Sequence, residues 1–151
     1  MYYLTIDTSW KSIVGVVEEK NGDVIELSSV MSEDARHHTE TLIPLIDTAM
    51  NAACIEKPDV IIIGRGPASF TGLRAGIITA RCLAKAWNVP LYGVSSLEVM
   101  ALGGADAGYN YLVPIIDARR KELFYLTARP MGGDDIALYS AADVITPGEL
   151  V

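Results

Sequence analysis

The N-terminal part of the chain alternates short apolar runs with turn residues, a pattern typical of strands joined by hairpins. Residues 2–7 form a β-rich run, and residues 12–19 form a second one that is rich in branched side chains. Asn21-Gly22 follows and is a strong hairpin signal, because both residues tolerate a positive φ. Residues 24–31 then form the returning strand. The pattern therefore predicts a three-stranded antiparallel meander.

The middle of the chain changes to helical spacing, with continuous apolar runs between the helical segments. Apolar positions three and four residues apart predict helices at about 39–53 and 70–86. Residues 60–63 are all branched and apolar, which is typical of a parallel strand buried on both faces. A second buried strand is predicted at 90–94, and a capping-box pattern at 95–98 opens a third helix.

The opening pattern of the chain returns near its other end. Ile6-Asp7 is followed by a turn and a strand, and Ile116-Asp117 is followed by a turn and a strand in the same way. Two copies of this pattern suggest a duplicated fold. The strands predicted for the second copy lie at 112–117, 122–128 and 136–139, the last being its third strand.

The order of the predicted elements indicates an α/β fold with an actin-like (ribonuclease-H-like) lobe. A meander followed by two right-handed crossovers gives a mixed five-stranded sheet, with helices expected on both of its faces. The glycine-containing segment 103–108 is the clearest internal boundary. We therefore predict a first actin-like lobe at residues 1–108. Residues 109–151 are predicted to be the start of a second lobe of the same type, incomplete and truncated.

Composition and charge narrow the classes of protein to which the chain can belong. The net charge is −7 and the twelve Lys and Arg residues are scattered, so the protein should not bind an RNA polyanion strongly alone. No apolar run is long enough to cross a membrane, and the N-terminus lacks the features of a signal peptide. We expect a cytoplasmic protein in which Cys54 and Cys82 are small buried hydrophobic residues.

Residues 64–76, GRGPASFTGLRAG, join a predicted strand to a predicted helix and are the richest candidate site. Their glycines permit tight turns and a close approach by another surface. The free N–H groups at the helix start could attract an anion, although the segment has neither a Walker motif nor a dinucleotide motif. The candidate anion-binding residues are Gly66, Ser69, Thr71 and Arg74.

The helix that follows carries a ridge of small residues four positions apart, formed by Gly72, Gly76, Ala80 and Ala84. Such a ridge lets another helix approach closely. Two interpretations stay open. The ridge packs on its own sheet or on the preceding helix, or it is exposed as a docking surface. In the second case, Gly76→Leu or Ala80→Arg would abolish partner binding and leave the fold largely intact.

Candidate catalytic and metal-binding residues are few. Asp7 and Asp117 end paired strands, where actin-type ATPases keep acidic residues around Mg²⁺, but the turns that follow lack a glycine-containing phosphate loop. A structural role in the turns is therefore the better hypothesis for both. His37, His38 and Glu40 lack the spacing of metal ligands and are interpreted as a polar cluster. No nucleophile comes with a recognisable base, so we expect neither a catalytic residue nor a metal site.

Several segments together resemble one protein family. GRGPASFTGLRAG is similar to the GPGSFTGLR-type signature of the TsaB (YeaZ) family, with Ala68 where that family commonly has Gly. Residues 6–9 match the family's opening, residues 36–44 resemble its R-x-H-S-E-x-L-x-P segment, and residues 116–119 resemble its I-D-A-R strand. The resemblance runs in order from residue 2 to about residue 128.

This resemblance implies an actin-like two-lobed protein without the active site of its paralogue TsaD. In that family, TsaD carries a metal-binding HxxxH motif and uses threonylcarbamoyl-adenylate to modify tRNA. TsaB pairs with TsaD through the two helices of its first lobe, and TsaE is a further ATPase component. Those helices correspond to 39–53 and 70–86 here. The implied partner interface consists of Leu42, Ile46, Ala49, Phe70, Gly72, Leu73, Gly76, Ala80 and Ala84.

The resulting hypothesis is a non-catalytic partner subunit that dimerises with TsaD and activates it for threonylcarbamoylation of adenosine in tRNA. The chain would then need no cofactor of its own, because ATP would be used by the partner machinery. It would contact tRNA only indirectly and would form a homodimer when alone. Two alternatives remain. One is an actin-type small-molecule kinase or ATPase with Asp7 and Asp117 around Mg²⁺, and the other is a metallopeptidase, as the family's old glycoprotease label suggests.

Overall fold

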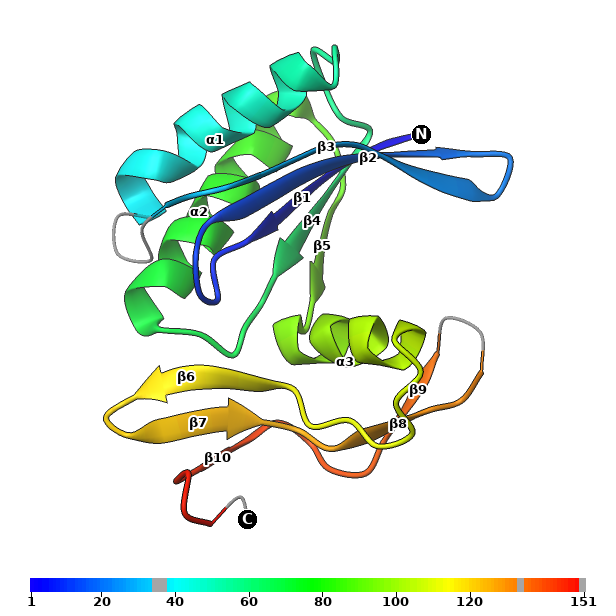
Figure 1. The fold of residues 1–151 in the computed structure, drawn as a ribbon. Coiled ribbons are helices and arrows are strands. Elements are labelled where there is room, and N and C mark those ends of the chain that lie inside the picture. Colours follow the sequence, from blue (N-terminus) through cyan, green and yellow to red (C-terminus); the bar gives the residue numbers. More distant parts are fainter. Residues whose placement is uncertain (34–37, 133–134, 150–151) are drawn as a thin grey trace.

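The computed structural model describes residues 1–33, 38–132 and 135–149, and its largest element is a five-stranded sheet (Figure 1). The strand order is β3-β2-β1-β4-β5. β2 runs antiparallel to β1 and β3, whereas β4 is parallel to β1 and β5. The predicted meander and mixed five-stranded sheet are confirmed. The strands are β1 (Tyr2–Asp7), β2 (Ile13–Lys20), β3 (Asp23–Met31), β4 (Val60–Gly64) and β5 (Leu91–Val94).

Two helices cover one face of this sheet. α1 (His38–Ala52) connects β3 to β4, and α2 (Phe70–Trp87) connects β4 to β5, and they lie side by side in Figure 1. The prediction of helices on both faces is therefore wrong. Both crossovers run in the same direction across the sheet, so the right-handed rule places both helices on the same side. No helix in the described part of the chain combines the length and apolar surface that a membrane span requires.

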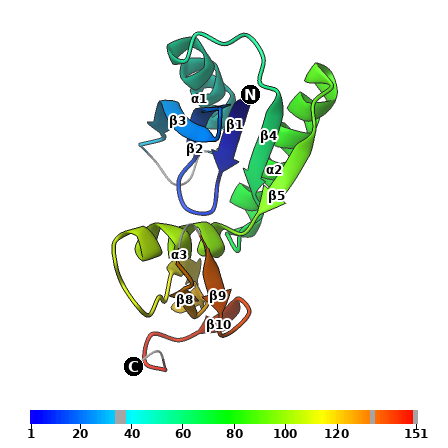
Figure 2. The same cartoon turned by 90° about the vertical axis from the view of Figure 1, so that its right-hand side faces the viewer.

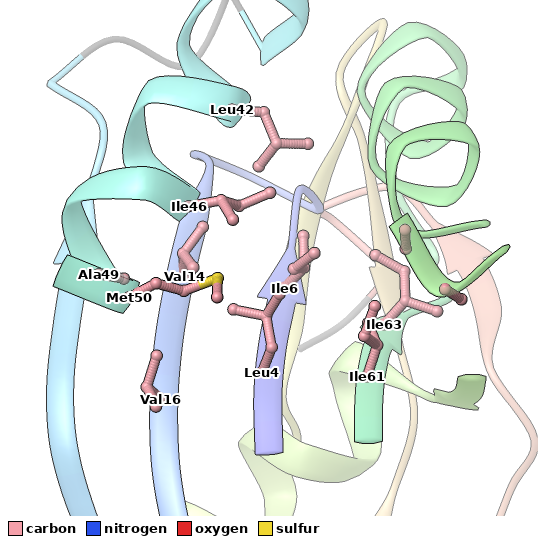
Figure 3. Packing of buried hydrophobic residues seen from close by; sticks show 12 residues of the cluster. Leu4, Ile6, Val14, Val16, Leu42, Ile46, Ala49, Met50, Ile61 and Ile63 are labelled. Carbon is pink, nitrogen blue, oxygen red and sulfur yellow. The ribbon is translucent and has the colours of Figure 1, made fainter. Parts of the chain in front are cut away.

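The hydrophobic core lies between the helix pair and the sheet. Successive side chains of a strand lie on opposite faces, so alternate residues such as Leu4 and Ile6 of β1 point toward the helices (Figure 3). Residues of α1, α2 and the sheet are buried together. The core consists of Leu4, Ile6, Val14, Val16, Leu42, Ile46, Ala49, Met50, Ile61, Ile63, Ala80 and Ala84.

The later part of the chain repeats the meander on a smaller scale. β6 (Ile115–Arg119), β7 (Glu122–Tyr125) and β10 (Asp143–Ile145) form an antiparallel sheet in the order β10-β7-β6. This order corresponds to β3-β2-β1 in the large sheet. A separate hairpin of β8 (Ala128–Pro130) and β9 (Ile136–Leu138) is inserted between β7 and β10.

The third strand of the second copy differs from the prediction. Residues 136–139 were expected to take this place, but β9 pairs with β8, and β10 pairs with β7 instead. β10 has only three residues, so its period-2 pattern is too short to recognise. A short strand of this kind depends on the neighbour that it pairs with rather than on its own pattern.

The third helix also differs from the prediction. α3 (Ser96–Asp106) continues through Gly103 and Gly104, which begin the segment predicted as the internal boundary. Leu97 and Ala101 of α3 pack in a second hydrophobic cluster with residues of the later strands, and this burial outweighs the helix-forming cost of the two glycines. Figure 2 shows α3 between the large sheet and the small strands. By its packing, α3 joins residues after the predicted boundary at 108.

The two cysteines are also placed differently from the prediction. Cys54 and Cys82 are free and exposed rather than buried. Cys54 follows α1 with a φ of 56°. Cys82 lies on α2 two positions from both Ala80 and Ala84, so it points away from the face that packs on the sheet.

Candidate functional site

One candidate site is a pocket between the two parts of the chain. It has a volume of about 550 Å³ and lies where the end of β1 faces α3 and β6. Apolar side chains form most of its wall, and two carboxylates reach it from the two copies of the repeated pattern. The lining residues are Asp7, Ser9, Trp10, Ile13, Ser96, Val99, Met100, Ile115, Ile116 and Asp117.

Asp7 is held at the end of β1 by donors from two segments. Its Oδ1 accepts hydrogen bonds from the hydroxyl and the backbone N–H of Ser9, the latter at 2.7 Å. Its Oδ2 accepts a hydrogen bond of 2.6 Å from the hydroxyl of Ser96 at the start of α3. Gly64 lies so close that a Cβ there would be 2.7 Å from the Asp7 Cγ. Asp7 therefore ties the turn after β1 to α3.

Asp117 makes the equivalent local contact in the second copy. Its Oδ1 accepts a hydrogen bond of 2.8 Å from the backbone N–H of Arg119, two residues later, as Asp7 does from Ser9. Short acidic side chains favour such turns because they replace a backbone acceptor. The predicted structural role of both aspartates in the turns is confirmed by these bonds.

The pocket offers carboxylates and apolar surface rather than cations. Among the described residues that line it, none is Lys or Arg, although phosphate groups are commonly bound by such side chains. Lys11 is the neighbour of Trp10, and its Nζ lies 5.0 Å from the centroid of that ring. The pocket chemistry thus suits an apolar or cationic group better than a nucleotide phosphate.

The apolar residues of this pocket were not predicted from the sequence. Trp10 is 56% exposed, Val99 51% and Met100 46%, so they contribute to no core pattern. The available signal was the capping box at Ser95. Its hydroxyl accepts a hydrogen bond from the Glu98 N–H at 3.4 Å, and this helix start orients Val99 and Met100.

The glycine-rich loop from 64 to 76 is tied to the neighbouring strand before it enters α2. The Arg65 N–H donates to the Val94 carbonyl at 2.8 Å, and the Ser96 N–H donates to the Gly66 carbonyl at 2.9 Å. Gly66 has a φ of 83°, a conformation that favours glycine. Its conformational freedom therefore serves a tight turn beside β5.

No hydrogen bond of the described residues links the side chains of the candidate anion-binding residues in this loop. Ser69 precedes α2, but its side chain makes no capping hydrogen bond. Thr71 and Arg74 are exposed, and the Arg74 guanidinium lies over the Phe70 ring, 3.8 Å from its centroid. Anion binding by Gly66 and these residues stays a prediction.

The small-residue ridge of α2 faces the sheet. Gly72, Gly76 and the two alanines of the ridge are buried. The Thr8 hydroxyl donates a hydrogen bond of 2.8 Å to the Gly72 carbonyl, and a Cβ at Gly76 would overlap that hydroxyl. The first interpretation of the ridge is confirmed. The expectation that Gly76→Leu or Ala80→Arg would leave the fold intact is wrong, because Gly76 has no room for a Cβ and Ala80 is fully buried in the core.

Most residues of the implied partner interface are also buried within the chain, because they face the sheet. Leu42, Ile46 and Ala49 lie in the core, as do Ala80 and Ala84 of the ridge. These positions share the face of each helix that packs on the sheet, so they give a partner no exposed surface. Of the implied residues, Phe70 is 70% exposed and Leu73 is half-buried.

The outward surfaces of α1 and α2 carry a different set of residues, which we term the outer helical face. Ile43 is 52% exposed and Ile78 59%, and a groove of about 370 Å³ runs between the helices. Ile78 lies two positions from Gly76 and Ala80, hence opposite the ridge, a spacing that could have revealed it. We define this face by its exposed charged and large apolar residues, which are Glu40, Ile43 and Asp47 of α1 and Phe70, Arg74, Ile78, Arg81 and Lys85 of α2.

Comparison with known proteins assigns the chain to a family. The family model described as TsaD, tRNA N6-adenosine threonylcarbamoyltransferase, matches residues 28–147. The chain belongs to the TsaD family. Within it, the TsaB (YeaZ) resemblance is confirmed by the relatives and by the solved structures.

An uncharacterised protein of Mycobacterium tuberculosis is 36% identical over 124 residues, which are 81% of this chain and 56% of that protein. The tRNA threonylcarbamoyladenosine biosynthesis protein TsaB of Bacillus subtilis is 30% identical over 126 residues, 82% of this chain and 53% of that protein. The structure of YeaZ from Pseudomonas aeruginosa matches with a TM-score of 0.81 and 27% identity, covering 97% of this chain and 68% of that chain. The actin-like fold class is thereby confirmed, and the chain spans about half the length of the curated relatives it matches.

The histidine segment of the TsaB resemblance is only partly described. His37 lies outside the described residues, and α1 begins at His38. Glu40 is exposed in the first turn of α1. Within the described residues, no three His, Cys, Asp or Glu side chains are grouped so that they could hold a metal ion.

Proposed function

We propose that this protein takes part in tRNA threonylcarbamoyladenosine biosynthesis as a non-catalytic partner subunit that binds and activates a TsaD-like protein. Membership of the TsaD family and the name of the Bacillus subtilis relative support the pathway. The observation that carries the partner role is the outer helical face, where exposed Ile43 and Ile78 lie among charged residues. Exposed apolar residues with a charged surround are typical of a protein interface.

The charges of this face support pairing with a second copy or with a paralogue of the same fold. α1 exposes Glu40 and Asp47, whereas α2 exposes Arg74, Arg81 and Lys85. In a two-fold arrangement, α1 of one subunit lies against α2 of the other, and acids then face bases. We propose a homodimer when the chain is alone and a heterodimer when a TsaD-like protein is present.

The rest of the chemistry is assigned to the partners in this proposal. The chain would use no cofactor of its own, ATP would be used by the partner machinery, including a TsaE-like ATPase, and most of the tRNA contact would belong to the TsaD-like subunit. The net charge of −7 supports this division, because strong RNA binding requires many cations.

Ile78→Asp is expected to weaken binding of the TsaD-like protein from the same cell by about 30-fold, because it places a charge in an apolar contact. Ile78 is 59% exposed, so the fold should not change. Val24→Asp is the matched control, since Val24 is 71% exposed on β3 and lines a groove with Tyr3 and Ile62 on the other face of the sheet. Affinity capture with the tagged chain and a tRNA modification assay measure the two effects.

The outcomes separate the interface from the function. Equal capture by both variants would place the interface elsewhere on the chain. Failure of the unmodified chain to raise threonylcarbamoylation by its captured partner would refute the function itself. Loss of both capture and modification in Ile78→Asp, but not in Val24→Asp, is the expected result.

A second candidate function is ATP binding, which one observation favours. Asp7 and Asp117 line the same pocket, as Mg²⁺-binding carboxylates of an actin-type ATPase would. The hydrogen bonds that occupy Asp7 and the apolar wall argue against it. Calorimetric titration with Mg²⁺-ATP is expected to give no binding heat for the chain alone. Binding that disappears in Asp7→Asn would instead establish the second function.

A further inference from the structure

The turn between β6 and β7 consists of basic residues in a conformation that such residues rarely adopt. Arg119, Arg120 and Lys121 have φ angles of 66°, 54° and 66°. Arg120 and Lys121 thus form a primed hairpin turn, a type that strongly favours Asn-Gly. The β2–β3 turn of the same chain uses that favoured pair, with Asn21 at 58° and Gly22 at 88°.

This choice of residues costs free energy of folding. A side chain beyond Cβ crowds the following carbonyl in the left-handed region, so long side chains are disfavoured there. Asn at 120 and Gly at 121 would form the same turn with less strain. Because this strain is not compensated by a contact within the described part of the fold, it indicates a function for the side chains of the turn.

The side chains of this turn are directed to solvent rather than to the fold. All three residues are exposed, and within the described residues Arg120 and Lys121 have no hydrogen bond or ion pair of their side chains. The Arg119 guanidinium lies 3.9 Å from the Asp117 carboxylate, with 56% of its side chain exposed. Three consecutive cations therefore stand at the tip of the small sheet, at the left in Figure 1.

We propose that this basic turn, Arg119 to Lys121, contacts backbone phosphates of the tRNA. The inference rests on the proposed function, because it is the tRNA pathway that supplies a polyanion to a chain with a net charge of −7. A planar guanidinium can bind a phosphate with two parallel hydrogen bonds, and a Lys adds a point charge. Two or three such contacts orient an RNA without binding it strongly. The expectation of purely indirect tRNA contact is thus refined to one local contact.

The test uses Arg120→Asn/Lys121→Gly in the complex with the TsaD-like protein. The variant should raise the Tm of the chain by about 4 °C, because the turn strain is relieved. It should also weaken tRNA binding about ten-fold at low salt and reduce the slope of log K against log salt by about 1.5, the value for two lost phosphate contacts. Greater stability with weaker RNA binding is a combination that a purely structural turn would not show.

The control variant Lys20→Asn/Lys57→Asn removes the same charge from exposed positions at the end of β2 and in the loop before β4. It should bind tRNA as the unmodified complex does. An equal loss in both variants would show a general charge effect and overturn the inference. Unchanged binding by the turn variant would overturn it as well.

Two further measurements keep the inference separate from the proposed function. Arg120→Gln/Lys121→Gln removes the charges without changing the turn strain, so it must lose tRNA affinity even where the first variant misfolds. If the turn variant loses the TsaD-like protein instead of tRNA, the turn contacts an acidic protein surface, and the inference fails while the proposed function stands. If the unmodified chain binds no TsaD-like protein, the proposed function fails, and tRNA binding by the chain alone at low salt then decides the inference.

Discussion

Replacing Gly64 with alanine is expected to lower the free energy of unfolding by about 4 kcal/mol, through overpacking and a lost hydrogen bond to a charged group. The added Cβ would overlap the Asp7 carboxylate, lying 2.7 Å from its Cγ and 3.0 Å from the Ser96 Oγ. The carboxylate cannot move away cheaply, because Ser9 and Ser96 hold it from two sides. Urea denaturation followed by circular dichroism measures the loss.

The origin of this loss can be isolated with a second substitution. In an Asp7→Ala background the carboxylate is absent, so Gly64→Ala should lower the free energy of unfolding by less than about 1 kcal/mol. The difference between the two backgrounds would measure a strong coupling between Gly64 and Asp7. A cost that is equal in both backgrounds would contradict the contact with Asp7. It would show instead that β4 needs glycine for its backbone at this position.

The parts of the fold that were predicted correctly depend on local signals. Asn21-Gly22 encodes the β2–β3 turn in two residues, and the branched run at 60–63 predicts β4. The side of the sheet that α1 and α2 cover depends instead on the direction of two crossovers, which requires the complete strand order. β10, with three residues, becomes a strand only beside β7. Such features depend on tertiary contacts and leave little trace in a local pattern.

The candidate sites show the same limit. Helical spacing identified the small-residue ridge correctly but did not show what covers it. The answer comes from Thr8, which is 64 positions before Gly72 in the chain and bonds to its carbonyl. The repeat of Ile-Asp predicted the equivalent turns at Asp7 and Asp117, whereas the apolar wall of their pocket, including Trp10, has no sequence pattern. Equivalent positions in a repeat can be predicted from the sequence. The apolar wall of the pocket between Asp7 and Asp117 cannot, because it forms only when the two copies pack together.

Gly76→Ala is expected to lower the free energy of unfolding by about 3 kcal/mol, as overpacking and a lost buried hydrogen bond exceed the gain in helix propensity. The new Cβ would overlap the Thr8 Oγ1 and lie 3.2 Å from its Cγ2 and 3.4 Å from the Ile63 Cδ1. Thr8 is 1% exposed, and its hydroxyl would have to leave the Gly72 carbonyl. Thermal and urea denaturation of the variant measure the change.

The same substitution at Gly103 provides the control, because it should act in the opposite direction. Gly103 lies inside α3 and is exposed, and a Cβ there would meet no atom within 4 Å. Gly103→Ala should therefore raise the free energy of unfolding by about 0.5–1 kcal/mol, the difference in helix propensity. A loss of stability at both positions would contradict the argument from Thr8, since it would mean that glycine is needed in both helices for a reason other than space. Opposite signs would show that Gly76 of α2 is retained for close packing on Thr8 and the sheet.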